Sequence, residues 1–470
     1  MFQNLVKKFK LDFCGADSPP QEILEKRKLS LAKFQREIPK SEMESFLPDT
    51  NFTNYYRVPF PYTEELSSLN TSSLFIDKDE SKYDAFSSYG VNVFGKKFYE
   101  DCIQSATERF KEYGFFLNSV HPVALENISI LQKISGLDSV SFHMSGTEAV
   151  LNACRLAKFA TGKKKILKFA GAYHGWASIP DLVEIKNIKD LKKARNCAAI
   201  LINPIQFLFP KGSIKLDAML LVGNQPTMKT REEYSKELQE IKKICEEKKI
   251  LFILDEVFLG FRLAYGGCQE FFQVKADLVT YGKTLGGGLP VGVVCGKKEY
   301  MNKFNSEYPL KFLANRGTFS AHPLVMLTMN EFLKRVKPEL YANIDSTWNS
   351  RVELLNNRIK KYNLEFKNLG SILSIHHKNF SIYNWVLQLY LKKNKIYLGP
   401  YGSSRLVFQN NLSIEDWKEI ENQIVSSIEE MDADGWLYSR FKSRKEQYYF
   451  YLKTFLKETF KYGDTRNLQT

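Results

Sequence analysis

The sequence predicts an α/β fold: a mainly parallel central sheet with helices on both faces, plus a smaller α+β domain. Between about Ser73 and Val325, short β-branched runs alternate with stretches of helical periodicity, which is typical of strands connected by helices. From Met326 on, helical patterns dominate. The chain has 470 residues, of which 44% are hydrophobic and 14% aromatic. A chain of this size and composition can bury a large core and form two or three domains.

Six apolar runs are expected to form the strands of the sheet. They are SVSFHM (139–144), KKILKF (164–169), AAILI (198–202), ILFIL (250–254), DLVTY (277–281) and VGVVCG (291–296). Changes in composition and in the pattern of strands and helices along the chain also predict five parts. They are an N-terminal extension (1–72), a first part of a small domain (73–115), a large domain (116–325), a C-terminal small domain (326–434) and a basic aromatic helical tail (435–470). Within the extension, Pro19 and Pro20 suit the start of an amphipathic helix.

Composition narrows the class of protein. The seven cysteines are scattered, with no CxxC pair and no metal-like cluster with the six histidines, which favours a reducing compartment and no metal site. Neither a signal peptide nor a run of about 18 apolar residues is visible, so we expect a cytoplasmic protein without a membrane span. The net charge of +14 could serve nucleic acid, an acidic protein or only a solvated surface. Because the lysines are spread out and no nucleic-acid module is recognisable, we expect no nucleic-acid partner.

In open α/β sheets, ligands bind beyond the carboxyl ends of the strands, so a ligand site is expected among the residues that follow each run. After the first run comes HMSGTEAVLNACRLAKFATG, in which Ser145 and Glu148 fit a capping box and Gly162 suits a helix end. An ordinary capped helix explains this pattern by itself. Alternatively, the free N–H groups of Gly146 and Thr147, with the Ser145 and Thr147 hydroxyls, could hold a phosphate at the positive end of the helix dipole.

Two further runs deliver polar side chains to the same edge. Tyr173 and His174 follow a strand in ILKFAGAYHGWAS, where the aromatic ring could lie flat against a ligand or simply be buried beside a turn. The run ILFIL reads as a strand buried on both faces and ends at Asp255 and Glu256. Since a buried carboxylate without a partner is costly, one of these two acids is expected to have a cationic partner.

The most unusual stretch is YGKTLGGGLPVG, in which Lys283 follows a predicted strand among five glycines. Glycines let the backbone approach a ligand or another segment closely, so we favour a lysine held in a site over a solvated one. A desolvated lysine amine is the usual material for Schiff-base chemistry. A lysine, a strand-end Asp255 and a phosphate-binding helix start together suggest pyridoxal phosphate, with the acid on the pyridine nitrogen.

Five separated motifs carry a resemblance to a known family. SGTEA, YHG, DEVFLGFR, GKTLGGGLPVG and GTFSAHPL, in this order and spacing, resemble class III pyridoxal-phosphate aminotransferases of fold type I. The subgroup that the chain resembles is glutamate-1-semialdehyde aminomutase-like and includes aminotransferase domains embedded in lipopeptide and polyketide synthases. The resemblance covers about Ser73 to Asp434.

The resemblance implies a PLP-dependent enzyme and a role for each motif. Lys283 would form the Schiff base with pyridoxal 5'-phosphate and move the proton at the substrate α-carbon. Asp255 would pair with the pyridine nitrogen, Val257 would pack on one ring face, and Tyr173, followed by His174, would stack on the other. Ser145, Gly146 and Thr147 would bind the phosphate, joined by Thr318 from the neighbouring subunit, because the family's sites form across a homodimer interface.

Departures from the family pattern bear on the reaction. The family commonly has a Glu-Pro pair after the strand that precedes the Asp strand, whereas this chain has Asn203 and Pro204. Aminomutases carry a gating glutamate, but the stretch from Leu398 to Ser413 contains no acid. We therefore expect transfer of an amino group from an amino-acid donor to an aldehyde or keto acceptor, either free or on an acidic carrier protein. An aminomutase, and a non-catalytic protein that binds nucleic acid or protein through its basic surface, remain as alternatives.

Overall fold

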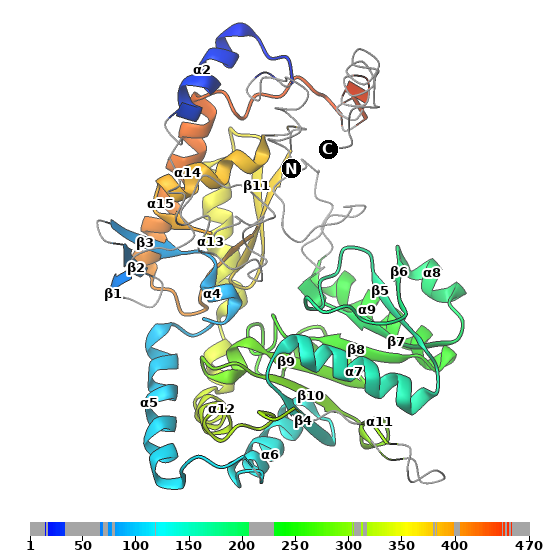
Figure 1. The fold of residues 1–470 in the computed structure, drawn as a ribbon. Helices are drawn as coiled ribbons and strands as arrows, with labels where there is room; N and C mark the ends of the chain where they lie inside the picture. Colours follow the sequence, from blue (N-terminus) through cyan, green and yellow to red (C-terminus); the bar gives the residue numbers. More distant parts are fainter. Residues whose placement is uncertain are drawn as a thin grey trace, which may run out of the picture.

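The computed structural model describes most of the chain, and Figure 1 shows its fold. The described residues are chiefly 17–32, 66–68, 74–77, 80–117, 119–205, 230–302, 317–378, 383–398 and 405–443, with a few single residues beside them. Most of the predicted N-terminal extension and C-terminal tail lies outside these ranges. Among the described helices, none combines the length and the apolar character needed to cross a lipid bilayer.

A seven-stranded sheet forms the larger part of the molecule, with strand order β4-β10-β9-β8-β7-β5-β6. All six predicted strands are present, and the chain adds β6, a short strand at the edge. The pairings among β6, β5, β7, β8 and β9 are parallel, whereas β10 runs antiparallel to both β9 and β4. The prediction of a mainly parallel sheet is therefore confirmed. The strands are β4 (Ser139–His143), β5 (Lys165–Phe169), β6 (Leu182–Ile185), β7 (Cys197–Ile202), β8 (Leu251–Asp255), β9 (Leu278–Gly282) and β10 (Gly292–Gly296).

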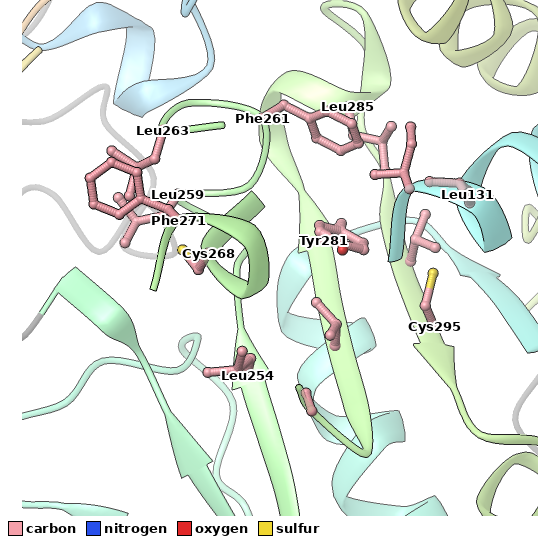
Figure 2. Packing of buried hydrophobic residues seen from close by; sticks show 14 of the residues in the cluster. Leu131, Leu254, Leu259, Phe261, Leu263, Cys268, Phe271, Tyr281, Leu285 and Cys295 are labelled. Carbon is pink, nitrogen blue, oxygen red and sulfur yellow. The ribbon is translucent and has the colours of Figure 1, made fainter. Parts of the chain in front are cut away.

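Helices cover both faces of this sheet, because its central strands are apolar on both sides. On β8, Phe252 and Leu254 belong to one hydrophobic cluster, while Leu251 and Ile253 belong to another that packs under α7. Figure 2 shows the first cluster, in which Leu254, Tyr281 and Cys295 come from three neighbouring strands. The helices and 3-10 turns of this part are α5 (Lys96–Tyr113), α6 (Val123–Ser135), α7 (Gly146–Thr161), α8 (Ile188–Lys193), α9 (Arg231–Lys248), α10 (Gly267–Phe271), η3 (Lys283–Gly286), α11 (Lys298–Met301) and α12 (Pro323–Arg335).

Two smaller sheets and their helices form the remainder. One sheet has the order β11-β12-β14, and the other, β1-β2-β3-β13, joins strands from both ends of the chain. A separate hydrophobic cluster lies here, centred on Trp348, Phe408 and Trp417. The elements are β1 (Leu66–Ser68), β2 (Leu74–Asp77), β3 (Glu80–Asp84), α4 (Ser87–Gly90), η4 (Pro338–Tyr341), α13 (Ile344–Arg358), β11 (Leu364–Leu369), β12 (Ile372–His377), η5 (Asn384–Val386), α14 (Leu387–Lys393), β13 (Ile396–Tyr397), β14 (Arg405–Val407) and α15 (Ile414–Ala433).

The predicted domain boundaries stay a prediction. α5 packs against α12 within the first cluster, and Arg109 Nη1 lies 2.9 Å from Glu331 Oε1. The predicted boundary between residues 325 and 326 falls inside α12. Near the N-terminus, α2 (Gln21–Ala32) begins directly after the two prolines, as predicted. Its Arg27 is fully buried and donates hydrogen bonds to Gly435 O and Tyr438 O, so this helix is tied to the start of the C-terminal tail.

Candidate active site

Lys283 stands at the carboxyl end of the central sheet, where β9 gives way to η3. Its backbone adopts a φ of 47°, a left-handed conformation that is unusual for a side-chain-bearing residue and is often found at functional sites. The side-chain Nζ donates a hydrogen bond to Tyr89 O at 2.7 Å and lies 5.5 Å from the centre of the Phe258 ring. The end of β9 thus places the Lys283 amine between the sheet and α4, which contains Tyr89.

The electrostatic surroundings make this amine easier to deprotonate. The Lys283 side chain keeps some contact with solvent, but the protein around it lowers its pKa to about 8. Burial is the main cause, the positive charge of Arg262 adds to it, and Asp255 opposes it. Burial favours the neutral amine because a charge in a low-dielectric environment is poorly solvated. At neutral to mildly alkaline pH, a substantial fraction of Lys283 is therefore available as a nucleophile or base.

Asp255 ends β8, next to the strand that delivers Lys283, and its carboxylate is buried. Oδ1 accepts hydrogen bonds from Thr280 Oγ1 at 3.0 Å and from Val257 N at 3.2 Å. Oδ2 lies 2.7 Å from Nδ1 of the buried His174. A carboxylate offers about four acceptor positions, and the described residues use three of them. One position on Oδ2 is left for a further donor, such as a protonated ring nitrogen.

The neighbouring Glu256 faces a different environment, and this separates the two strand-end acids. Its side chain is fully buried, and Oε2 accepts a hydrogen bond from Cys268 N at 2.7 Å. Burial raises the pKa of Glu256 to about 7. Asp255, which contacts His174, is therefore the acid that belongs to the candidate site.

The predicted helix start is present at α7. Ser145 is the N-cap, and its Oγ accepts a hydrogen bond from Glu148 N at 3.1 Å. The Glu148 carboxylate, however, bonds to Met144 N and not to the N-cap itself, so the motif differs from the expected capping box by one residue. The first intrahelical bond is donated by Ala149 N, which leaves the N–H groups of Gly146 and Thr147 ahead of it at the positive end of the helix.

Close backbone approaches bring the separate motifs together. A Cβ atom on Gly146 would lie only 2.4 Å from Val257 Cγ1, so the start of α7 sits directly against the residue that follows the Asp255–Glu256 pair. A Cβ atom on Gly175 would lie 2.7 Å from Thr147 Oγ1, which places the Tyr173–His174 loop beside the same helix start. Both glycines are therefore required by packing. These contacts bring together the start of α7, Asp255 and the Tyr173–His174 loop.

The remaining predicted residues differ in how they are held. Tyr173 is 56% exposed, and burial of the rest of its side chain, with the Asp255 charge, raises its pKa. A ring that is half open to solvent beside Asp255 is suited to cover a flat ligand. Thr318 is exposed in a turn, and no described contact joins it to the other site residues. Its expected role in a neighbouring subunit stays a prediction.

Several residues of the site were not anticipated. Tyr89, whose carbonyl accepts from Lys283, comes from a segment 194 residues away in sequence, and no local pattern marks it. Thr280 could have been found, since a polar residue inside the apolar run DLVTY needs a hydrogen-bond partner when it is buried. In the sequence, Asn203 stands out only as a departure from a family pattern, but its side-chain Nδ2 donates a hydrogen bond to Tyr173 O.

Together, an amine, a carboxylate with a free acceptor position and a helix start suit a cofactor that combines an aldehyde, an aromatic ring nitrogen and an anionic group. The family described as "Aminotransferase class-III" matches residues 70–179 and 227–431, and the chain belongs to this family. A glutamate-1-semialdehyde 2,1-aminomutase of Methanococcus maripaludis (strain C6 / ATCC BAA-1332) is 30% identical over 341 residues, which cover 68% of this chain and 77% of the relative. Family membership confirms the predicted PLP-dependent class III enzyme.

Solved structures support the fold. A structure described as a transaminase with PLP bound aligns with a TM-score of 0.69 at 21% identity and covers 87% of this chain and 99% of that chain. A glutamate-1-semialdehyde aminomutase from Pseudomonas aeruginosa PAO1 aligns with a TM-score of 0.66 at 15% identity and covers 87% and 98% of the two chains. The predicted fold type I architecture is confirmed by these alignments.

Proposed function

We propose that this chain is an aminotransferase that moves an amino group from an amino-acid donor to an aldehyde or keto acceptor, with pyridoxal 5'-phosphate bound through Lys283. The observation that carries the proposal is the pair of neighbouring strand ends, where an amine with a pKa of about 8 lies close to a buried carboxylate with one acceptor position left. When bound, the cofactor supplies an electron sink for the reacting carbon.

The residues around this pair fit the other parts of the cofactor. The N–H groups of Gly146 and Thr147, with the hydroxyls of Ser145 and Thr147, would hold the phosphate at the start of α7. Val257 would contact one face of the ring, and the half-exposed Tyr173 would cover the other. Lys283 would move the proton at the substrate α-carbon, because its amine is the available base with a pKa near the operating pH.

The pH dependence of cofactor loading follows from Lys283. Only the neutral amine attacks an aldehyde, and the amine is protonated below its pKa and neutral above it. When cofactor-free protein is mixed with pyridoxal 5'-phosphate, we expect the rate of covalent attachment to rise with pH through about 8 and then level off. Stopped-flow absorbance would measure this rate. A midpoint near the ordinary lysine value of about 10.4 would contradict the lowered pKa.

An aminomutase is the second candidate, because relatives with about 30% identity include enzymes named glutamate-1-semialdehyde 2,1-aminomutase. Against it stands the absence of any acid between Leu398 and Ser413 in the sequence, where a gating glutamate is expected. One assay can distinguish transamination from the aminomutase reaction. Amino donors would be combined with aldehydes and keto acids, and glutamate-1-semialdehyde would be supplied alone. Efficient formation of 5-aminolevulinate in the second reaction would replace the transaminase proposal.

The acceptor could be free or attached to an acidic carrier protein. The net charge of +14 favours encounter with an acidic partner, since complementary charge increases the association rate most at low salt. Rates on a free acceptor and on its carrier-bound form, compared at low and high salt, would decide between the two. A preference for the free acceptor that salt does not change would exclude the carrier.

We also propose a homodimer, and the surface around Thr318 supports it. Phe115, Phe116 and Phe319 are exposed, and the rings of Phe115 and Phe319 lie 5.8 and 6.3 Å from the His322 ring. Exposed apolar patches of this kind commonly mark interfaces. A second copy covering this patch would carry its Thr318 toward a neighbouring site.

Charge in this patch should therefore separate the subunits. Phe319→Asp is expected to convert a dimer to a monomer in light scattering and to lower turnover at least about tenfold, because one aromatic anchor often dominates an interface. The matched control is Leu354→Asp, which changes an exposed apolar residue of α13. A wild-type protein that is active as a monomer would contradict the dimer proposal.

A further inference from the structure

Asn203 lies at the carboxyl end of β7, between the strands that carry the Tyr173 loop and Asp255. Its side chain is buried and uses both ends of the amide. Nδ2 donates a hydrogen bond to Tyr173 O at 3.2 Å, and Oδ1 accepts one from Ile205 N at 3.2 Å. Residue 203 also falls in the interval between the two stretches that match the family, so family membership assigns it no role.

The loop that Asn203 holds carries two residues of the candidate site. Tyr173 provides the half-exposed ring, and His174 places Nδ1 2.7 Å from Asp255 Oδ2. On its other side, the loop passes Thr147 so closely that only glycine fits at position 175. Asn203 on one side and the start of α7 on the other therefore hold the loop in place.

The amide can make both of these bonds at any ordinary pH, because it carries a donor and an acceptor. A carboxylate could accept from Ile205 N, but it has no proton to donate to Tyr173 O. Its oxygen would then lie against the Tyr173 carbonyl oxygen, and the two acceptors would repel each other. The carboxylate would also place a negative charge in a buried position close to Asp255, which is costly.

We propose that Asn203 is a positioning residue that fixes the Tyr173–His174 loop, and through it the His174–Asp255 hydrogen bond and the aromatic cover of the cofactor. The inference rests on the proposed function, since the loop matters only if the cofactor ring binds against Tyr173 with its nitrogen at Asp255. Asn203 touches neither Lys283 nor Asp255 in the hydrogen bonds of the described residues. Its effect is therefore on the orientation and retention of the cofactor.

Asn203→Asp provides a test with an internal rescue, because it keeps the shape and changes only the donor. At pH 8 the new acid is ionised, cannot donate to Tyr173 O, and should release pyridoxal 5'-phosphate about tenfold faster than wild type, the lower range for a residue that orients a ligand-holding group. Once protonated, its carboxyl group can again donate to Tyr173 O and accept from Ile205 N. The defect should therefore disappear as the pH falls toward about 6, since burial and Asp255 raise the pKa of an added acid.

The measurement is the rate of cofactor release, followed by the loss of protein-bound visible absorbance and expressed relative to wild type at each pH. Because each rate is divided by the wild-type rate at the same pH, pH effects that the two proteins share cancel. The ionisable groups around the loop are Tyr173, His174, Asp255 and Lys168, whose Nζ donates a hydrogen bond to Ala172 O. Asn203→Ala lacks both bonds and should be defective at every pH. Asn187→Asp, an exposed N-cap at which either residue can accept from Asp190 N, is the matched control and should behave as wild type.

The outcomes distinguish this inference from the proposed function. If wild type binds cofactor and Asn203→Asp releases it at the wild-type rate at pH 8, or with a defect that does not change with pH, Asn203 is not a positioning residue. If wild-type protein takes up no pyridoxal 5'-phosphate, the proposed function itself fails, whatever the variants do.

Discussion

Replacing Lys283 with alanine is expected to abolish covalent attachment of pyridoxal 5'-phosphate and to lower turnover by about four orders of magnitude or more. The substitution removes both the amine that binds the cofactor and the base at the substrate α-carbon, and either loss alone is large. Folding should change little, because the Lys283 side chain makes one described hydrogen bond, to Tyr89 O, and keeps contact with solvent. Absorbance after gel filtration and the mass of borohydride-reduced protein would measure the attachment.

The matched control is Lys164→Ala, which removes an exposed lysine at the opposite, amino end of the strands. It should retain the visible band and turnover. A Lys283→Ala protein that still carried covalent cofactor would show that another lysine forms the link. A colourless wild-type protein that takes up no cofactor would overturn the proposed function. The alternative would then be a non-catalytic protein that binds a partner through its basic surface.

The central sheet and the strand-end residues could be predicted because their signals are local. Each of the six apolar runs forms a strand; Asp255 follows one run directly, and Lys283 follows another after Gly282. In a parallel sheet, neighbouring carboxyl ends lie at one edge, so sequence order was enough to bring these residues together. The two-sided burial of β8 also follows from its unbroken apolar run.

The parts that could not be predicted depend on contacts between distant segments. The antiparallel insertion of β10 between β9 and β4 has no signature within its own residues. The partner of the Lys283 amine is a backbone carbonyl, that of Tyr89, and any residue type could supply it. Similarly, Arg27 reads in the sequence as an ordinary solvated charge, yet it is buried against the C-terminal segment and donates to Gly435 O and Tyr438 O. The amphipathic pattern expected for this helix is also weak, since its polar and apolar residues are not separated onto two faces.

Some of the lysines that give the chain its net positive charge make structural hydrogen bonds at helix ends. Lys163 Nζ donates to Lys248 O and Lys249 O at the end of α9, and Lys248 Nζ donates to Ala194 O just after α8. Helix C-termini carry free carbonyls and a partial negative charge, so cations there stabilise the helices. Part of the lysine content thus serves the helices that end at the amino edge of the sheet.

Asp255→Asn is expected to keep the cofactor but to slow the half-reaction with an amino donor by about 10²- to 10³-fold, the usual cost of removing one preorganised electrostatic group. A neutral amide cannot stabilise a protonated pyridine nitrogen, so the ring withdraws electrons less strongly. The amide oxygen can still accept from Thr280 Oγ1 and Val257 N, which preserves the end of β8. The amide nitrogen then faces His174, and the imidazole has to offer an acceptor at Nδ1 in place of the donor it offers to a carboxylate.

Rapid mixing with excess amino donor, followed at the visible cofactor band, isolates this step from product release. Glu256→Gln is the informative comparison, because it removes the neighbouring acid, whose Oε2 bonds to Cys268 N. It should keep the half-reaction rate within a few-fold of wild type, since the amide oxygen can still accept that bond. If Asp255→Asn reacted like wild type while Glu256→Gln lost the half-reaction, the roles assigned to the two acids would be reversed. If both reacted like wild type, neither acid would be the partner of the ring nitrogen.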